Sequence, residues 1–123
     1  MFYSQSFPKN AAASAHAREM LAQMRAEMPE SMLDDARLLA SELVANAVEH
    51  ATDDAEVEIR MDLSDERLRV EVLATGAGFD WVPRRHDAGN ERGWGLHFTD
   101  QVSSRWAIER GERNCVWFEL DRP

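Results

Sequence analysis

The chain has 123 residues, of which 44% are hydrophobic and 30% are charged, and its formal net charge is -9. This length and mixture fit one globular domain, residues 1–123, and exclude a disordered chain. The acidic excess argues against a nucleic-acid partner, because nucleic-acid binders present a basic surface to the phosphates.

Other classes are excluded by what the sequence lacks. No apolar run approaches the roughly 20 residues of a membrane span, and the first residues lack the basic and apolar blocks of a signal peptide. The single cysteine, Cys115, has no partner for an internal disulfide, which fits a reducing compartment. We therefore expect a cytoplasmic protein with no membrane partner.

The first expected element is a short strand, residues 2–7, which Pro8 ends. Asn10 then caps a helix to about Met28, since its side chain can accept a hydrogen bond from a free amide in the first turn. Four methionines recur at helical spacing in this region: Met20, Met24, Met28 and Met32. We favour a core-facing stripe for them over a soft binding surface.

Pro29 ends that helix, and Ser31 starts the next with Asp34 three residues on, the spacing of a capping box. The second helix, Leu33 to about Ala51, has the strongest amphipathic pattern of the chain. Its apolar stripe consists of Ala36, Leu39, Ala40, Leu43, Ala47 and Val48.

A β-hairpin is expected next, because two segments alternate apolar and polar residues around a turn. Its strands are residues 55–63 and 68–74, and the turn is Ser64-Asp65-Glu66. Periodicity is absent from Thr75 to Gly93, where glycines and a proline predict an irregular loop.

A short helix from about Gly95 to Val102 follows, and two strands, residues 105–110 and 114–120, complete the chain. The element order is then β-α-α-β-β-α-β-β. This order predicts an α+β two-layer sandwich, in which a mixed sheet has helices on one face.

Three polar side chains share one side of the second helix, because Glu42, Asn46 and His50 stand four residues apart. At about 100° per residue their row borders the apolar stripe, where the wall of a pocket would lie. A carboxylate there can accept a proton, and an amide oxygen can coordinate a hard cation such as Mg²⁺. The alternative is a solvated helix edge, with His50 at the end where the helix dipole favours a cation.

Two glycine motifs border the irregular loop. The first, Gly76-Ala77-Gly78-Phe79, follows a strand, and its glycines let the backbone approach a ligand or turn tightly. The second, Gly93-Trp94-Gly95-Leu96, opens the short helix, whose free amides would form an anion site. Either motif alone is also typical of a loop that only turns the chain.

The order of these elements resembles the histidine-kinase-like ATPase (GHKL) superfamily, and within it the small anti-sigma-factor serine/threonine kinases of bacteria. The likeness covers essentially the whole chain, and its most specific stretch is residues 39–51. It implies the Bergerat-type fold and a site for ATP with Mg²⁺. It also implies a regulator that sequesters a sigma factor and phosphorylates a serine or threonine of an antagonist protein.

The resemblance further implies roles for single residues. Glu42 matches the catalytic carboxylate that assists phosphoryl transfer, and Asn46 matches the ligand of the Mg²⁺ that bridges the ATP phosphates. The first glycine motif matches the loop beside the adenine, and the second matches the loop over the phosphates. The cofactor-binding set is Asn46, His50, Ala74, Gly76, Gly78, Phe79, Gly93, Trp94, Gly95 and Leu96.

The chain departs from the family pattern where the adenine loop reads Asp-x-Gly-x-Gly. In the family that Asp accepts a hydrogen bond from the adenine amino group, but here the position is Ala74. Losing a hydrogen bond to a charged group, about 1.5–3 kcal/mol, would weaken nucleotide binding roughly ten- to hundredfold. Two further departures are Trp94, in place of a basic or small residue, and Asn114-Cys115, where a threonine often precedes the last strand.

The sequence therefore leaves two candidate functions. The first is an active ATP-dependent kinase, and the second is a degenerate module of the same fold that acts through protein contacts with weak or no nucleotide binding. A sensor-kinase fragment and a metal enzyme are disfavoured, the latter because the four histidines are scattered. A homodimer is left open, with the methionines of the first helix as its candidate surface.

Overall fold

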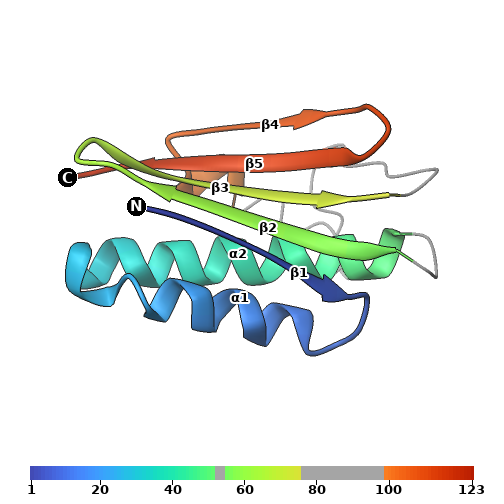
Figure 1. The fold of residues 1–123 in the computed structure, drawn as a ribbon. Coiled ribbons are helices and arrows are strands. Elements are labelled where there is room, and N and C mark those ends of the chain that lie inside the picture. Colours follow the sequence, from blue (N-terminus) through green and yellow to red (C-terminus); the bar gives the residue numbers. More distant parts are fainter. Residues whose placement is uncertain (52–54, 76–98) are drawn as a thin grey trace, which may run out of the picture.

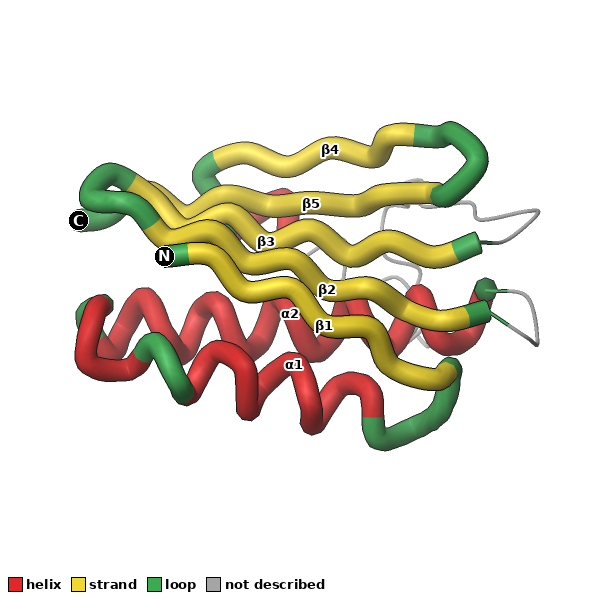
Figure 2. Tube along the Cα trace, viewed as in Figure 1, coloured by secondary structure: helices red, strands yellow, loops and turns green. Residues whose placement is uncertain are grey.

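The computed structural model describes residues 1–51, 55–75 and 99–123. Five strands form one layer, and two α-helices cover one of its faces (Figure 1, Figure 2). Residues 99–102 are also helical. The predicted α+β two-layer sandwich is confirmed. Its elements are β1 (Phe2–Pro8), α1 (Ala13–Ala22), the 3-10 helix η1 (Arg25–Glu27), α2 (Glu30–His50), β2 (Glu56–Leu63), β3 (Arg67–Ala74), β4 (Arg105–Glu109) and β5 (Asn114–Asp121).

The sheet has the order β1-β2-β3-β5-β4, and every neighbouring pair of these strands is antiparallel. The prediction of a mixed sheet is therefore wrong for the described strands. The helix pair α1–α2 returns the chain so that β2 enters beside β1 in the opposite direction. β4 runs in the same direction as β3, but β5 lies between them and is antiparallel to both.

The core lies between the sheet and the helices. Alternation along the strands sends every second side chain into it and leaves the others on the outer face of the sheet. The inward set on β2, β3 and β5 includes Val57, Ile59, Met61, Leu63, Leu68, Val70, Val72, Val116, Phe118 and Leu120.

The methionine stripe belongs to this core. Met20, Met24, Met28 and Met32 are 4%, 0%, 7% and 5% exposed. The core-facing interpretation is therefore confirmed. The alternative of a binding or dimer surface formed by these methionines is wrong, because their side chains are buried in the core.

The first helix is shorter than predicted. Asn10 holds a turn ahead of it: its Oδ1 accepts a hydrogen bond from the Ala12 N–H at 2.9 Å, and its carbonyl accepts one from the Ala13 N–H at 3.2 Å. The helix begins only at Ala13 and ends at Ala22, so Asn10 is not its N-cap.

The second helix is longer than predicted at its start. It begins at Glu30 with Pro29 as the N-cap, so the expected Ser31–Asp34 capping box does not form. Proline suits this place because its amide carries no hydrogen to leave unsatisfied. No helix in the described part of the chain is long and apolar enough to cross a membrane.

One end of the sandwich brings together several chain segments. Lys9 Nζ donates to the carbonyl of Ala51 at 2.7 Å, which joins the end of β1 to the end of α2. The register pairs Pro8 with Glu56, so β2 begins at this end. β3 ends there too, because Ala74 pairs with the second residue of β2. Figure 1 shows this end at the right.

Candidate functional site

Helix α2 has a polar flank on each side of its buried stripe. Ser41 marks the flank that faces α1, because its carbonyl accepts a hydrogen bond from Ser14 Oγ and its Oγ accepts one from Arg18 Nη1, both at 3.1 Å. Asn46 follows Ser41 by five residues, which is about 140° around the helix at 100° per residue. Asn46 therefore lies on the other flank, as does Glu42 one helical turn before it.

The flank of Glu42 and Asn46 faces the part of the helical side that α1 does not cover. α1 packs on β1, whereas α2 packs on β2, β3 and β5 in the middle of the sheet. The order of the sheet puts β5 and β4 on the side away from α1. This is the side where the sequence predicts the wall of a pocket.

Both side chains of the predicted pair are half-buried. In the described part of the chain, neither Glu42 nor Asn46 has a hydrogen-bond or ion-pair partner. Buried polar groups normally have such partners, so this carboxylate and this carboxamide keep their capacity for a ligand. His50 is the last residue of α2.

Ala74 ends β3 at the same end of the molecule as the C-terminus of α2. Its methyl group is 1% exposed and belongs to the core, on the face shared with Val70 and Val72. In the register it lies between Val57 on β2 and Asn114 on β5. The position offers no side-chain acceptor, as the sequence predicts.

The sequence flags Asn114 only as a departure, yet the structure places it beside Ala74. Residues that pair across strands point to the same face, with Cβ atoms about 4.5–5.5 Å apart. Asn114 is 8% exposed, so its carboxamide is buried on the helical side next to the Ala74 methyl. A signal for this exists in the sequence, since counting back along one face of β5 from Leu120, Phe118 and Val116 leads to residue 114.

The remaining predicted site residues lie outside the described ranges, as does most of the predicted irregular loop between Thr75 and Gly93. These residues are Gly76, Gly78, Phe79, Gly93, Trp94, Gly95 and Leu96. The described part of the candidate site is therefore the Glu42–Asn46 flank of α2 and the Ala74–Asn114 pair at the adjoining end of the sheet.

The sequence matches the model of the family described as histidine kinase-like ATPase domain over residues 7–120. No curated protein matches it.

Solved structures show the same fold. The nucleotide-free catalytic domain of the histidine kinase ThkA has a TM-score of 0.59 at 14% identity, covering 98% of this chain and 98% of that one. The mycobacterial sensor histidine kinase MprB has a TM-score of 0.60 at 11% identity, covering 98% of this chain and 99% of that one. At such identities the likeness concerns the fold.

Proposed function

Because the chain belongs to the family of histidine kinase-like ATPase domains, we propose that it binds ATP with Mg²⁺ and is a regulatory serine/threonine kinase of the anti-sigma type. It withholds a sigma factor from RNA polymerase in the cytoplasm and phosphorylates a small antagonist protein. The observation that carries the proposal is the Glu42–Asn46 pair, which is half-buried and without partners among the described residues.

In this proposal the two residues divide the work. Mg–ATP, when bound, would supply the phosphoryl group and leave as ADP, and the Mg²⁺ would neutralise part of the phosphate charge. Asn46 would hold the cation through its side-chain oxygen, a hard ligand that suits Mg²⁺. Glu42 would take the proton from the attacking hydroxyl of the partner protein. Residues four apart on a helix have Cβ atoms about 5–6 Å apart, so one face of α2 serves both steps.

Asn114 supports the adenine part of the proposal. Asn114 already has an interaction within the protein, but an amide oxygen has two lone pairs, so it can accept a hydrogen bond beside the position where Ala74 offers nothing. A neutral acceptor contributes about 0.5–1.5 kcal/mol, against about 1.5–3 kcal/mol for a charged one. We therefore expect ATP to bind, but roughly tenfold more weakly than with a carboxylate at this place.

Titration of ATP with and without Mg²⁺ tests this account directly. Asn114→Ala should weaken binding about fivefold or more, and Ala74→Asp should strengthen it about tenfold. The melting temperature of each variant is recorded alongside. No binding of ATP to the wild-type chain at millimolar concentration would contradict the proposal.

The second candidate function is a degenerate module that acts through protein contacts alone, and the burial of Ala74 favours it. The methyl is 1% exposed, so an added carboxylate needs a cavity or a ligand to accept it. If Ala74→Asp loses several kcal/mol of stability with no gain in nucleotide affinity, the pocket is filled and this second function holds.

Phosphotransfer is tested with the natural partners. Affinity capture from the native cell, with the chain as bait, supplies candidate sigma factors and antagonists. With Mg–ATP, the wild-type chain should phosphorylate a captured antagonist on serine or threonine. Glu42→Gln should be at least about a hundredfold slower while still binding nucleotide and partner, because only proton transfer is lost. Equal phosphorylation rates for the wild type and Glu42→Gln would show that Glu42 takes no part in proton transfer.

A further inference from the structure

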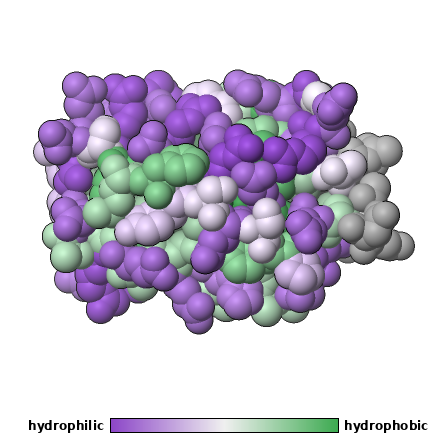
Figure 3. Space-filling model, viewed as in Figure 1, coloured by the Kyte–Doolittle hydropathy of each residue, from purple (hydrophilic) through white to green (hydrophobic). Residues whose placement is uncertain are grey.

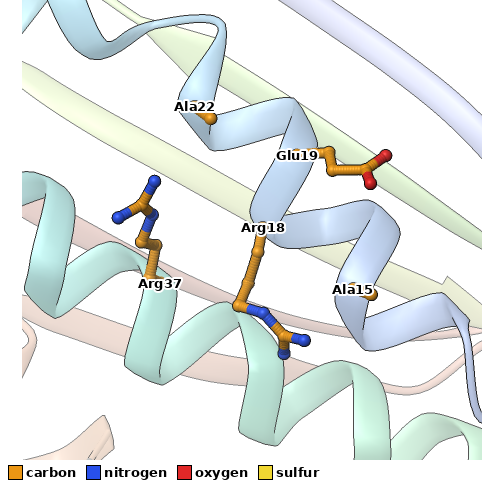
Figure 4. A pocket seen from close by; sticks show the side chains of 5 residues that line it. All are labelled: Ala15, Arg18, Glu19, Ala22 and Arg37. Carbon is orange, nitrogen blue, oxygen red and sulfur yellow. The ribbon is translucent and has the colours of Figure 1, made fainter.

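A groove of about 420 Å³ runs between the two helices, on the flank of α2 opposite the Glu42–Asn46 pair (Figure 4). Its lining residues are Ala15, Arg18, Glu19 and Ala22 of α1 and Arg37 of α2. Ala15 and Ala22 are small, so the long side chains of the lining are those of Arg18, Glu19 and Arg37.

The two arginines line this groove from opposite walls. Figure 4 shows Arg18 reaching from α1 toward α2 and Arg37 reaching from α2 toward α1, whereas the Glu19 carboxylate points away from α2. Arg18 is held in place because its Nη1 donates to Ser41 Oγ at 3.1 Å. The groove therefore has a positive lining that its own carboxylate does not neutralise.

Arg37 lacks the partners that a guanidinium needs. Its Nε is buried and has no hydrogen-bond partner, and no ion pair to Arg37 exists within the described ranges. A guanidinium has five N–H donors and no acceptor, and leaving a buried donor unsatisfied is costly. Two like charges that line one groove also repel each other. An anionic acceptor in the groove would offset this repulsion and could bind the Nη groups of Arg37, whereas the buried Nε is out of its reach.

The charge of the whole chain makes this arrangement unusual. The sequence has 23 acidic residues against 14 lysines and arginines. On the outer face of the sheet, arginines such as Arg69 and Arg105 are bound to carboxylates of the chain itself. In a chain with so many carboxylates, two arginines that line one groove and have no ion pair among the described residues are available to an external anion.

We propose that this groove binds a carboxylate side chain from an acidic segment of a partner protein. A guanidinium and a carboxylate form paired, charge-assisted hydrogen bonds of matching geometry. The site lies on the other flank of α2 from Asn46, so the proposal does not depend on nucleotide binding.

A protein fits better than the other large anions. A net charge of -9 repels every polyanion over long range, and most strongly the highly charged ones such as nucleic acid and anionic membranes, whereas a short acidic segment carries few charges. The face seen in Figure 3, which includes β1 and α1, is mostly hydrophilic with small separate groups of hydrophobic residues. This composition suits a charged and local contact with one acidic segment of a partner protein.

The test is a nuclear magnetic resonance titration of the ¹⁵N-labelled chain with hexaglutamate peptide at low ionic strength. We expect the amides of Ala15, Ala22 and Ser41 and the Arg37 Nε–H signal to shift together. Arg37→Gln should weaken binding at least about tenfold. The matched control Arg25→Gln removes the same charge from an exposed residue of η1 and should change affinity less than twofold.

Several results would overturn the proposal. Equal weakening by Arg25→Gln would mean that only overall charge matters. Tighter binding of inorganic phosphate at the same signals would mean a site for small anions, and Arg37-dependent binding to vesicles with anionic lipid would mean a membrane contact. If Arg37→Gln lowers the melting temperature strongly, Arg18→Gln replaces it, because Arg18 is exposed and its loss leaves the core intact.

Discussion

Several charged side chains on the outer face of the sheet are paired with one another, whereas one polar side chain on each flank of α2, Asn46 and Arg37, has no such partner among the described residues. On the outer face, Glu119 accepts hydrogen bonds from Arg69 Nη1 at 3.2 Å and from Arg105 Nε at 2.9 Å. Beside α2, Asn46 and Arg37 have no hydrogen-bond or ion-pair partner in the described part of the chain.

The difference separates structure from function. Paired groups on the outer face satisfy one another and fix the alignment of β3, β5 and β4. Groups without partners on the flanks of α2 remain available to molecules from outside. Substitutions on the outer face should therefore change stability and spare binding, and substitutions beside α2 should do the reverse.

The largest effect on the outer face is expected for Glu119→Ala. Glu119 is 8% exposed, and its removal leaves the guanidinium groups of Arg69 and Arg105 with fewer acceptors. We expect a loss of about 2–3 kcal/mol in the free energy of unfolding, measured by urea denaturation, with ATP affinity unchanged.

A matched control for that variant is Glu66→Ala. Glu66 also pairs with an arginine, Arg67, but its side chain is 79% exposed. Exposed pairs contribute about 0–1 kcal/mol, so Glu66→Ala should be nearly neutral. If the two substitutions cost the same, the outer face does not stabilise the sheet in the way described.

A smaller effect on stability is expected at low pH. Hydrogen bonds from Arg113 and Arg60 hold the pKa of Glu58 at about 2, below its ordinary 4.5. Because the pKa is lowered by folding, the stabilisation is present above about pH 4.5 and is lost as the pH falls toward 2. Unfolding by urea at pH 7, 4 and 3 should show this loss, and Glu58→Gln should reduce its slope. An unchanged slope would contradict it.

The smallest effect concerns Cys115, which lies on the outer face and is 7% exposed. Burial raises the pKa of its thiol to about 11. Since the thiolate is the reactive form, the native chain should label slowly with a disulfide reagent at pH 8 and rapidly in urea. Rapid labelling of the native chain would show that the reagent reaches the Cys115 thiol in the folded state, which would contradict its burial.

Local patterns predicted the elements well. The hairpin of β2 and β3 follows from two alternating segments around Ser64, whose Oγ accepts from the Glu66 and Arg67 amides at 3.2 Å. The end of α2 and the inward methionines follow from helical spacing. The predicted start of each helix was wrong. Asn10 lies in a turn before α1, whose N-cap is Ala12, and Pro29 rather than Ser31 is the N-cap of α2.

Long-range features were not predictable in the same way. The antiparallel pairing of β3 with β5 joins residues 40 (Ala74 and Asn114) to 54 (Arg67 and Asp121) positions apart, and no local period reveals it. The same pairing brings Asn114 beside Ala74. The Arg18–Arg37 groove depends on how α1 packs on α2, which spacing within either helix does not show.

The central claim is that the partnerless flank of α2 binds Mg–ATP, and calorimetric titration of three chains tests it most directly. The wild-type chain should bind Mg–ATP, and Asn46→Ala should weaken that binding at least about tenfold, because the cation loses a ligand. Ser41→Ala, on the opposite flank of the same helix, should leave it unchanged. A wild-type chain that binds no Mg–ATP, or Asn46→Ala binding as tightly as Ser41→Ala, would contradict the claim.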